Sequence, residues 1–419
     1  MTVDQSAKAP RGLAKSAARR AAKKTARAFS RWRGIIVVLL LPTVSRERAV
    51  ADARNAGMCA VIEPAYHAPD PSSVRPIPVS EFTVITVPDV LLVGSAGLPI
   101  LKNGRILTEP VASPSGRLNV RAVERTIHEI GVLRLFFVVL KRRYAREVSC
   151  VRLRTAVHLI PRAAPTPGGA QYAHWYTENA AQIDAVERLR RDLPSDLVYV
   201  INAQITPFQE ELLARFGVDK ADLRPHSRLF THVESLVVAT LRNGHSRNSE
   251  YDPKALRRVR DRLTHSPRKT ASRSEPDGHK LVALLRVGER KRIITNISVV
   301  TEVLFEFGAD LVPNVASLQE DLTQVRQCRV MVGAHGAGLV KMLFCPRLEH
   351  VVELMPPGES PPDLYQRMAA ALGVEYHRIL GENPLQRSRL DKNADFAVPA
   401  NELRSLLTEL GCDPASAPG

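Results

Sequence analysis

Residues 330–353 read VMVGAHGAGLVKMLFCPRLEHVVE, and this stretch decides the fold of the second half of the chain. A β-branched apolar run leads into a glycine-rich turn, which is followed by an apolar helical pattern and a second β-branched run. This order predicts a buried strand, a short helix over residues 337–344 and another strand over 349–354. The glycines of the turn let a ligand come close to the backbone.

The start of this helix is the strongest candidate binding site in the sequence. Gly336, Ala337 and Gly338 would offer N–H groups that lack partners inside the helix, and the helix dipole favours negative charge there. A diphosphate is therefore the predicted ligand, with His335 as an added hydrogen-bond donor. The alternative is that the glycines serve close packing alone. Their spacing is not the dinucleotide fingerprint G-x-G-x-x-G, which argues against a dehydrogenase.

The surrounding sequence alternates regularly between strand and helix patterns. Such alternation predicts a doubly wound parallel sheet, on which ligands bind beyond the carboxyl ends of the strands. The predicted strands are 280–285, 309–313, 329–333, 349–354 and 374–378, and the predicted helices are 297–307, 317–327, 337–344 and 362–372.

Charged residues follow two of these strands. Arg286 and Arg292, with Arg290 and Lys291 between them, come after the first strand, where guanidinium groups could neutralise a diphosphate leaving group. Glu353 ends the strand after the glycine-rich turn, and its carboxylate could accept both hydroxyls of a ribose. A solvated loop and an exposed strand-end acid are the respective alternatives.

The first half of the chain shows a mixed α/β pattern. A strand over 35–41, a helix over 46–56 and a strand over 59–63 predict a βαβ unit. Asn103-Gly104 predicts a hairpin turn, because both residues accept positive φ. Further patterns predict strands at 90–93, 98–101 and 197–201, and helices at 171–191, 207–216, 253–263 and 399–410.

A second candidate site opens the helix predicted at 171–191. His174 and Glu178 are four residues apart and share a helix face, next to Trp175. A His/Glu pair beside an aromatic ring suits proton abstraction and stacking on a sugar. The alternative is a cluster that only packs and caps the helix.

The net charge of +16 is concentrated at the N-terminus, where residues 1–34 carry ten Lys or Arg and a single acid, Asp4. Residues 8–33 could bind an anionic membrane surface or nucleic acid, or remain a solvated extension. The low aromatic content of 5% argues against a nucleic-acid partner. Five scattered cysteines favour a reducing compartment, and no apolar run reaches the roughly 20 residues that span a bilayer.

These patterns divide the chain into five parts. Residues 1–34 form the basic tail, 35–263 an N-terminal α/β domain, 264–279 a polar linker, 280–380 a C-terminal Rossmann-like domain, and 381–419 a tail with one helix.

The segment around the glycine-rich turn resembles the signature of glycosyltransferase family 61. The resemblance extends to Arg286, to the block Arg292-Ile293…Asn296, to Ser317-Leu318-x-Glu320 and to His174-Trp175…Glu178. Three positions depart from the family pattern. Asp321 stands where glutamine is usual, Lys341 where asparagine is usual, and Leu285 replaces a serine.

The resemblance implies a GT-B-like α/β fold, in which two Rossmann-like domains face a cleft. It also implies an inverting glycosyltransferase that needs neither a metal nor another cofactor, and the sequence contains no Asp-x-Asp motif. The donor would be a nucleotide-sugar, with UDP as the expected nucleotide. The acceptor would be a glycan or a lipid-linked glycan in surface or capsular polysaccharide synthesis.

The combined prediction assigns a role to each candidate residue. Glu178 or His174 would be the general base and His335 a catalytic donor, while donor binding would use Arg286, Arg292, Gly336, Ala337, Gly338 and Glu353. The enzyme is expected in the cytoplasm, free or peripheral at the inner face of the cell membrane. A catalytically inactive protein that binds glycan or nucleic acid is the alternative.

Overall fold

The fold is that of a computed structural model, which leaves the N-terminal tail (1–34) and most of the predicted linker (264–279) outside the described residues. The residues it describes are 40–63, 66–68, 77–79, 82–111, 118–143, 150–160, 172–226, 229–240, 253–265, 280–286, 292–313, 317–357, 364–382 and 394–414.

The second half contains a five-stranded sheet in which every strand pair is parallel. The strands follow the order β13-β12-β14-β15-β16, which is that of a doubly wound sheet and confirms the prediction for this half. Their bounds are β12 (Lys280–Leu284), β13 (Asp310–Leu311), β14 (Cys328–Ala334), β15 (His350–Met355) and β16 (Glu375–Leu380).

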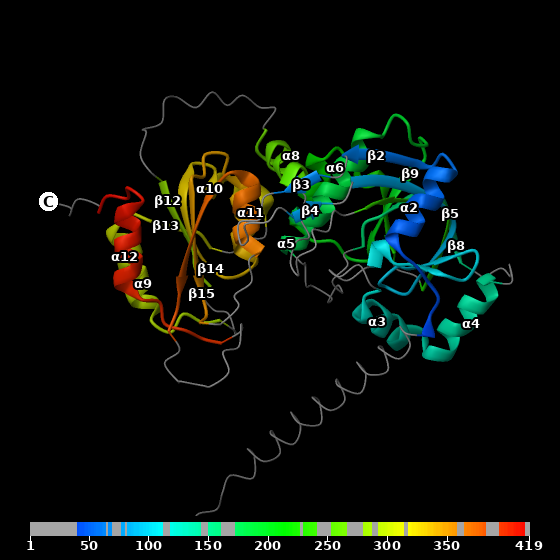
Figure 1. The fold of residues 1–419 in the computed structure, drawn as a ribbon, viewed down its shortest axis with the longest axis horizontal. Coiled ribbons are helices and arrows are strands. Elements are labelled where there is room, and N and C mark those ends of the chain that lie inside the picture. The colour runs from blue at the N-terminus through cyan, green and yellow to red at the C-terminus, as the bar shows by residue number, and fades with distance from the viewer. Residues whose placement is uncertain are drawn as a thin grey trace, which may run out of the picture.

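Helices cover both faces of this sheet (Figure 1). Helices α9 (Ile297–Glu306) and α12 (Ala400–Glu409) pack on one face. On the other face, toward the first half, lie α10 (Leu318–Val325), η4 (Ala337–Phe344) and α11 (Leu364–Leu372). The helix after the glycine-rich turn has its predicted bounds, but it is a 3-10 helix. Strands covered on both faces must be apolar throughout, which explains the continuous β-branched runs of the sequence.

The first half contains a nine-stranded mixed sheet with the order β1-β7-β6-β5-β11-β8-β9-β10, and β2 pairs with β5. Strands β11, β8, β9 and β10 are mutually parallel, whereas β5 is antiparallel to β11, so this half is only partly Rossmann-like. The bounds are β1 (Thr43–Val44), β2 (Cys59–Glu63), β5 (Phe82–Val93), β6 (Leu98–Leu101), β7 (Ile106–Leu107), β8 (Val151–His158), β9 (Leu197–Asn202), β10 (Leu223–His226) and β11 (Phe230–Ala239), with β3 (Tyr66–Ala68) and β4 (Ile77–Val79) in a separate pair.

The helical segments of the first half surround this sheet (Figure 1). They are α2 (Arg46–Asn55), η1 (Glu109–Val111), α3 (Val120–Ile130), α4 (Val132–Arg143), α5 (Tyr172–His174), η2 (Trp175–Asn179), α6 (Ala180–Arg188), α7 (Pro207–Arg215), η3 (Lys220–Asp222) and α8 (Pro253–Thr264). Within the described part of the chain, none of the helices combines the length and apolar character needed to cross a bilayer.

The predictions for the first half are right for several elements and wrong for their pairing. The hairpin at Asn103-Gly104 is confirmed, with Gly104 at φ 77°. The predicted βαβ unit does not appear among the described residues, because β2 pairs antiparallel with β5 and the described strand before α2 is β1, which pairs with β7. The predicted strand 35–41 lies largely outside the described residues, and Leu40 and Leu41 are not in a strand. Helices α3 and α4 and strands β8, β10 and β11 were not predicted.

The two halves share one hydrophobic cluster. Apolar side chains of α6, α7 and α8 pack with those of α10, η4 and α11, and α8 lies directly against α11 and η4. The proposed GT-B arrangement around a cleft stays a prediction.

A buried ion pair lies at this junction. Lys341 Nζ of η4 is 2.6 Å from Asp321 Oδ1 of α10, and the two side chains are 3% and 1% exposed. The Tyr172 hydroxyl, from the first half, donates to Asp321 Oδ2 at 2.5 Å. Asp321 and Lys341 are two of the three positions that depart from the family pattern. The structure thus brings two of the departures together in one ion pair.

We expect Lys341→Met to destabilise the protein by about 3–5 kcal/mol, because it leaves the Asp321 carboxylate buried without its counter-charge. The double variant Asp321→Asn/Lys341→Met should recover much of that loss, since the asparagine amide oxygen still accepts the Tyr172 hydroxyl. Urea unfolding of both variants measures the difference. A single variant within about 1 kcal/mol of the parent protein would contradict the pairing.

Candidate active site

The candidate site lies where the order of the parallel sheet reverses, between β12 and β14. Arg286 follows β12, and His335 and Gly336 follow β14, so residues about fifty positions apart meet at one sheet edge. A Cβ atom at Gly336 would collide with the guanidinium of Arg286. The absence of a side chain at Gly336 therefore leaves room for the Arg286 guanidinium in this position. Ligands of open α/β sheets bind at this reversal point.

A buried carboxylate holds His335 in place. The ring Nδ1 of His335 lies 2.5 Å from Glu353 Oε1, and the Tyr376 hydroxyl donates to Glu353 Oε2 at 2.5 Å. The side chain of Glu353 has 0% exposure, whereas that of His335 is 11% exposed. Since Nδ1 is committed to Glu353, Nε2 is the ring atom that can meet a ligand.

The buried carboxylate has two polar partners. Burying such a group is costly unless hydrogen bonds compensate for it, and the His335 ring and the Tyr376 hydroxyl supply them. These contacts fix the ring of His335 with Nε2 on the side away from Glu353.

Further contacts fix the backbone of the turn. Arg292 has an unusual positive φ of 55°, and its guanidinium donates to the His335 carbonyl at 3.0 Å. The Tyr365 hydroxyl donates to the Gly336 carbonyl at 2.5 Å. The carbonyl groups of His335 and Gly336 thus accept hydrogen bonds from within the protein. A strained backbone conformation such as the positive φ of Arg292 is typical of functional sites.

The pKa of the Tyr365 phenol depends on its burial and on the charged groups around it. Burial is the main cause that raises the pKa of Tyr365, and the charge of Glu353 adds to this effect. The positive charges of Arg292 and Arg286 oppose it, which places both guanidinium groups within electrostatic range of the turn. Tyr365 therefore stays protonated and donates, and two arginines and a histidine surround the start of η4.

Glu353 is fully buried, whereas a residue that binds the ribose must have an accessible carboxylate. Both of its oxygens accept hydrogen bonds from protein side chains, and the residue has no exposed surface. The exposed strand-end acid, which was the alternative, is also wrong. The structure makes Glu353 the group beneath His335 that orients its ring.

The second predicted site forms another carboxylate–histidine pair. His174 Nδ1 contacts Glu178 Oε1, with side-chain exposures of 38% for the histidine and 5% for the acid. Residues Trp175–Asn179 form a π-helical turn, a feature that often marks functional sites. Segment α5 lies against η4, so the structure brings this pair's helix to the helix that follows the glycine-rich turn.

Several residues near these sites differ from their sequence-based roles. Trp175 is 0% exposed in the core, so the prediction that it stacks on a sugar is wrong. Asn296 precedes α9 but does not cap it with its side chain; instead it binds the backbone N–H and carbonyl of Val398. Arg290 and Lys291 lie outside the described residues.

Sequence reasoning missed Tyr365 and Tyr376. Tyr365 belongs to no recognisable sequence motif, although its hydroxyl binds the Gly336 carbonyl. Tyr376 reaches Glu353 only because β16 pairs with β15. A strand pattern alone does not reveal which neighbour a side chain will meet.

Comparison with known protein families finds a match, and it covers most of the residues described above. Residues 172–352 match the family model Glycosyltransferase 61, a range that includes the His174–Glu178 pair, the glycine-rich turn and His335 and ends one residue before Glu353. The match supports a glycosyltransferase similar to those of family 61, a class of enzymes that move a sugar from a donor to a glycan acceptor. No curated protein matches the chain in sequence.

The glycines of the turn differ in what they tolerate. A Cβ atom at Gly333 would collide with the buried side chain of Leu339, whereas one at Gly338 would meet nothing within 4 Å. We expect Gly333→Ala to cost about 1–3 kcal/mol of stability through overpacking. Gly338→Ala is the matched control and should stay within about 0.5 kcal/mol of the parent protein. Equal unfolding free energies for the two variants would refute the close packing of Leu339 on the strand.

Proposed function

We propose that this protein is an inverting glycosyltransferase that takes its sugar from a nucleotide-sugar, with UDP as the nucleotide, and needs no metal ion. Its product would belong to a surface or capsular polysaccharide. The observation that carries this proposal is the corner at the sheet reversal, where the Arg286 guanidinium lies at Gly336 and Arg292 binds the carbonyl of His335, just before the start of η4. Phosphate oxygens are bound by such donors.

In the proposed reaction an acceptor hydroxyl attacks the anomeric carbon of the donor sugar. The bond from that carbon to the phosphate oxygen breaks on the opposite face, and the nucleoside diphosphate leaves with the bonding electron pair. Negative charge therefore grows on the leaving oxygen as the reaction proceeds. His335 Nε2–H and the two guanidinium groups would stabilise that charge, which is the role a divalent cation plays in other enzymes.

The acceptor hydroxyl must lose its proton during the attack. We propose His174 as the base, because its ring is the exposed member of the second pair and Glu178 is buried behind it. Glu178 would orient the ring and stabilise its charge after the proton has moved. The contact between α5 and η4 supports an acceptor position next to the donor corner.

We expect His335→Ala to lower kcat by about 100-fold or more, because it removes a donor to the leaving group. Glu353→Gln should also lower kcat, since glutamine keeps the shape beneath the ring but has only one acceptor oxygen for the two partners, His335 and Tyr376. Release of UDP from UDP-sugars in the presence of acceptor measures both effects. His128→Gln, an exposed histidine on α3, is the control. A folded His335→Ala enzyme with unchanged turnover would exclude this histidine from the chemistry.

Diphosphate contacts can be separated from nucleoside contacts by comparing two ligands. We expect Arg286→Gln to weaken UDP binding about tenfold or more, as for the loss of a charge-assisted hydrogen bond, and to leave uridine binding unchanged. Gly336→Ala should have the same effect with an intact arginine, because its Cβ displaces the guanidinium. Isothermal titration calorimetry gives both affinities. Equal losses for UDP and uridine would place Arg286 away from the diphosphate.

A further inference from the structure

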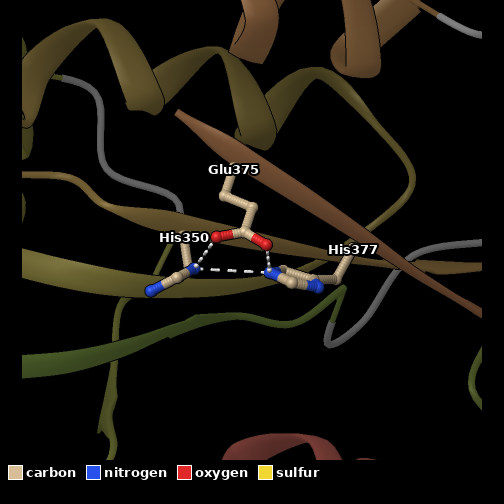
Figure 2. A group of neighbouring side chains, drawn as sticks. All are labelled: His350, Glu375 and His377. Atoms are coloured by element: carbon tan, nitrogen blue, oxygen red, sulfur yellow. Dashed lines mark hydrogen bonds and ion pairs between the residues drawn. The ribbon is translucent and has the colours of Figure 1, made fainter. Parts of the chain in front are cut away.

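A cluster of His350, Glu375 and His377 lies at the opposite edge of the same sheet. His350 and Glu375 are the first residues of β15 and β16 and pair in register, and His377 is two positions further along β16. All three side chains therefore project from one face of the sheet. Figure 2 shows the three side chains turned toward one another.

This cluster is separate from the candidate active site. Glu353 and Tyr376 alternate with His350 and His377 along their strands, so they project from the other face. Val352 and Leu354 share the face of His350 and belong to the core under α9 and α12. The cluster thus sits at the amino edge on the outer face, whereas the turn after β14 sits at the carboxyl edge.

The donor atoms lie close to the spacing of ligands around one tetrahedral ion. His377 Nε2 lies 3.3 Å from His350 Nδ1, His350 Nδ1 lies 3.4 Å from Glu375 Oε2, and His377 Nε2 lies 3.8 Å from Glu375 Oε1. Ligands at about 2.0–2.1 Å from a tetrahedral zinc ion are about 3.3 Å apart. The distance between the two imidazole nitrogens equals this ligand spacing. A small movement of the Glu375 carboxylate would bring one of its oxygens to the same distance from both nitrogens.

The surroundings allow an ion to enter and a fourth ligand to bind. The Glu375 side chain is 65% exposed, and those of His350 and His377 are 21% and 19% exposed. The rings are therefore fixed by packing, while the carboxylate can adjust to the metal. Two imidazoles and one carboxylate form a ligand set that suits zinc and similar transition ions and not Mg²⁺.

We propose that His350, Glu375 and His377 bind one transition-metal ion, with Zn²⁺ as the matching ion and a water molecule as the fourth ligand. The ion would link β16, the edge strand of the sheet, to its neighbour β15. It would thereby stabilise the strand pair that also carries Tyr376 and Glu353 on its other face. This site is structural, because it lies at the far edge of the sheet from the groups proposed for sugar transfer.

The test measures Zn²⁺ bound to the full-length protein after metal removal and dialysis, by elemental analysis and by calorimetric titration. Glu375→Gln, His350→Gln and His377→Gln should each weaken binding tenfold or more and abolish the rise in Tm that Zn²⁺ causes in the parent protein. The exposed His128→Gln is the matched control and should bind Zn²⁺ as the parent does. Mg²⁺ should give no rise in Tm.

The proposal is overturned if the parent protein binds no Zn²⁺, or if Glu375→Gln binds it as tightly as the parent. Glu375 is well exposed, so its replacement preserves the fold even where a histidine variant does not. UDP binding of the zinc-free protein is independent of this outcome, so the two proposals can fail separately.

Discussion

The buried carboxylate of Glu353 is the constraint on which the candidate active site depends. It has no exposed surface and binds His335 with one oxygen and the Tyr376 hydroxyl with the other. A buried carboxylate needs hydrogen-bond partners, and this need fixes the orientation of the histidine ring. Arg292 and Tyr365 then hold the carbonyl groups of the same turn. The turn proposed to bind the diphosphate is therefore held in one arrangement by contacts within the protein.

The order of the parallel sheet explains why these groups meet. Reversal of strand order between β12 and β14 leaves an open corner, and Arg286 and the glycine-rich turn reach it from two separate strands. Behind this corner, η4 packs into a core shared with the first half of the chain. The Asp321–Lys341 pair and the Tyr172 hydroxyl lie in that junction, so the first half is joined directly to the helix that follows the turn.

Sequence periodicity predicted the second half well, because its strands and helices alternate with few irregular segments. Five strands, the helices between them and the 337–344 helix all appear near their predicted bounds. The first half was harder, since β5 and β11 are long neighbours in an antiparallel pair that connects distant parts of the chain. Local patterns gave α2 and β2 correctly, but they did not predict β1, which pairs with β7, or the antiparallel pairing of β2 with β5.

The sequence by itself determined the parallel α/β half, the glycine-rich turn with His335, and the pairing of His174 with Glu178 along one helix. All three follow from local spacing, which the chain carries in its own order. The tertiary structure alone decided that Glu353 points inward, that Tyr365 and Tyr376 support the turn, and that Asp321 and Lys341 neutralise each other. Those contacts depend on which strands and helices become neighbours, and sheet order and register are fixed only when the whole core packs.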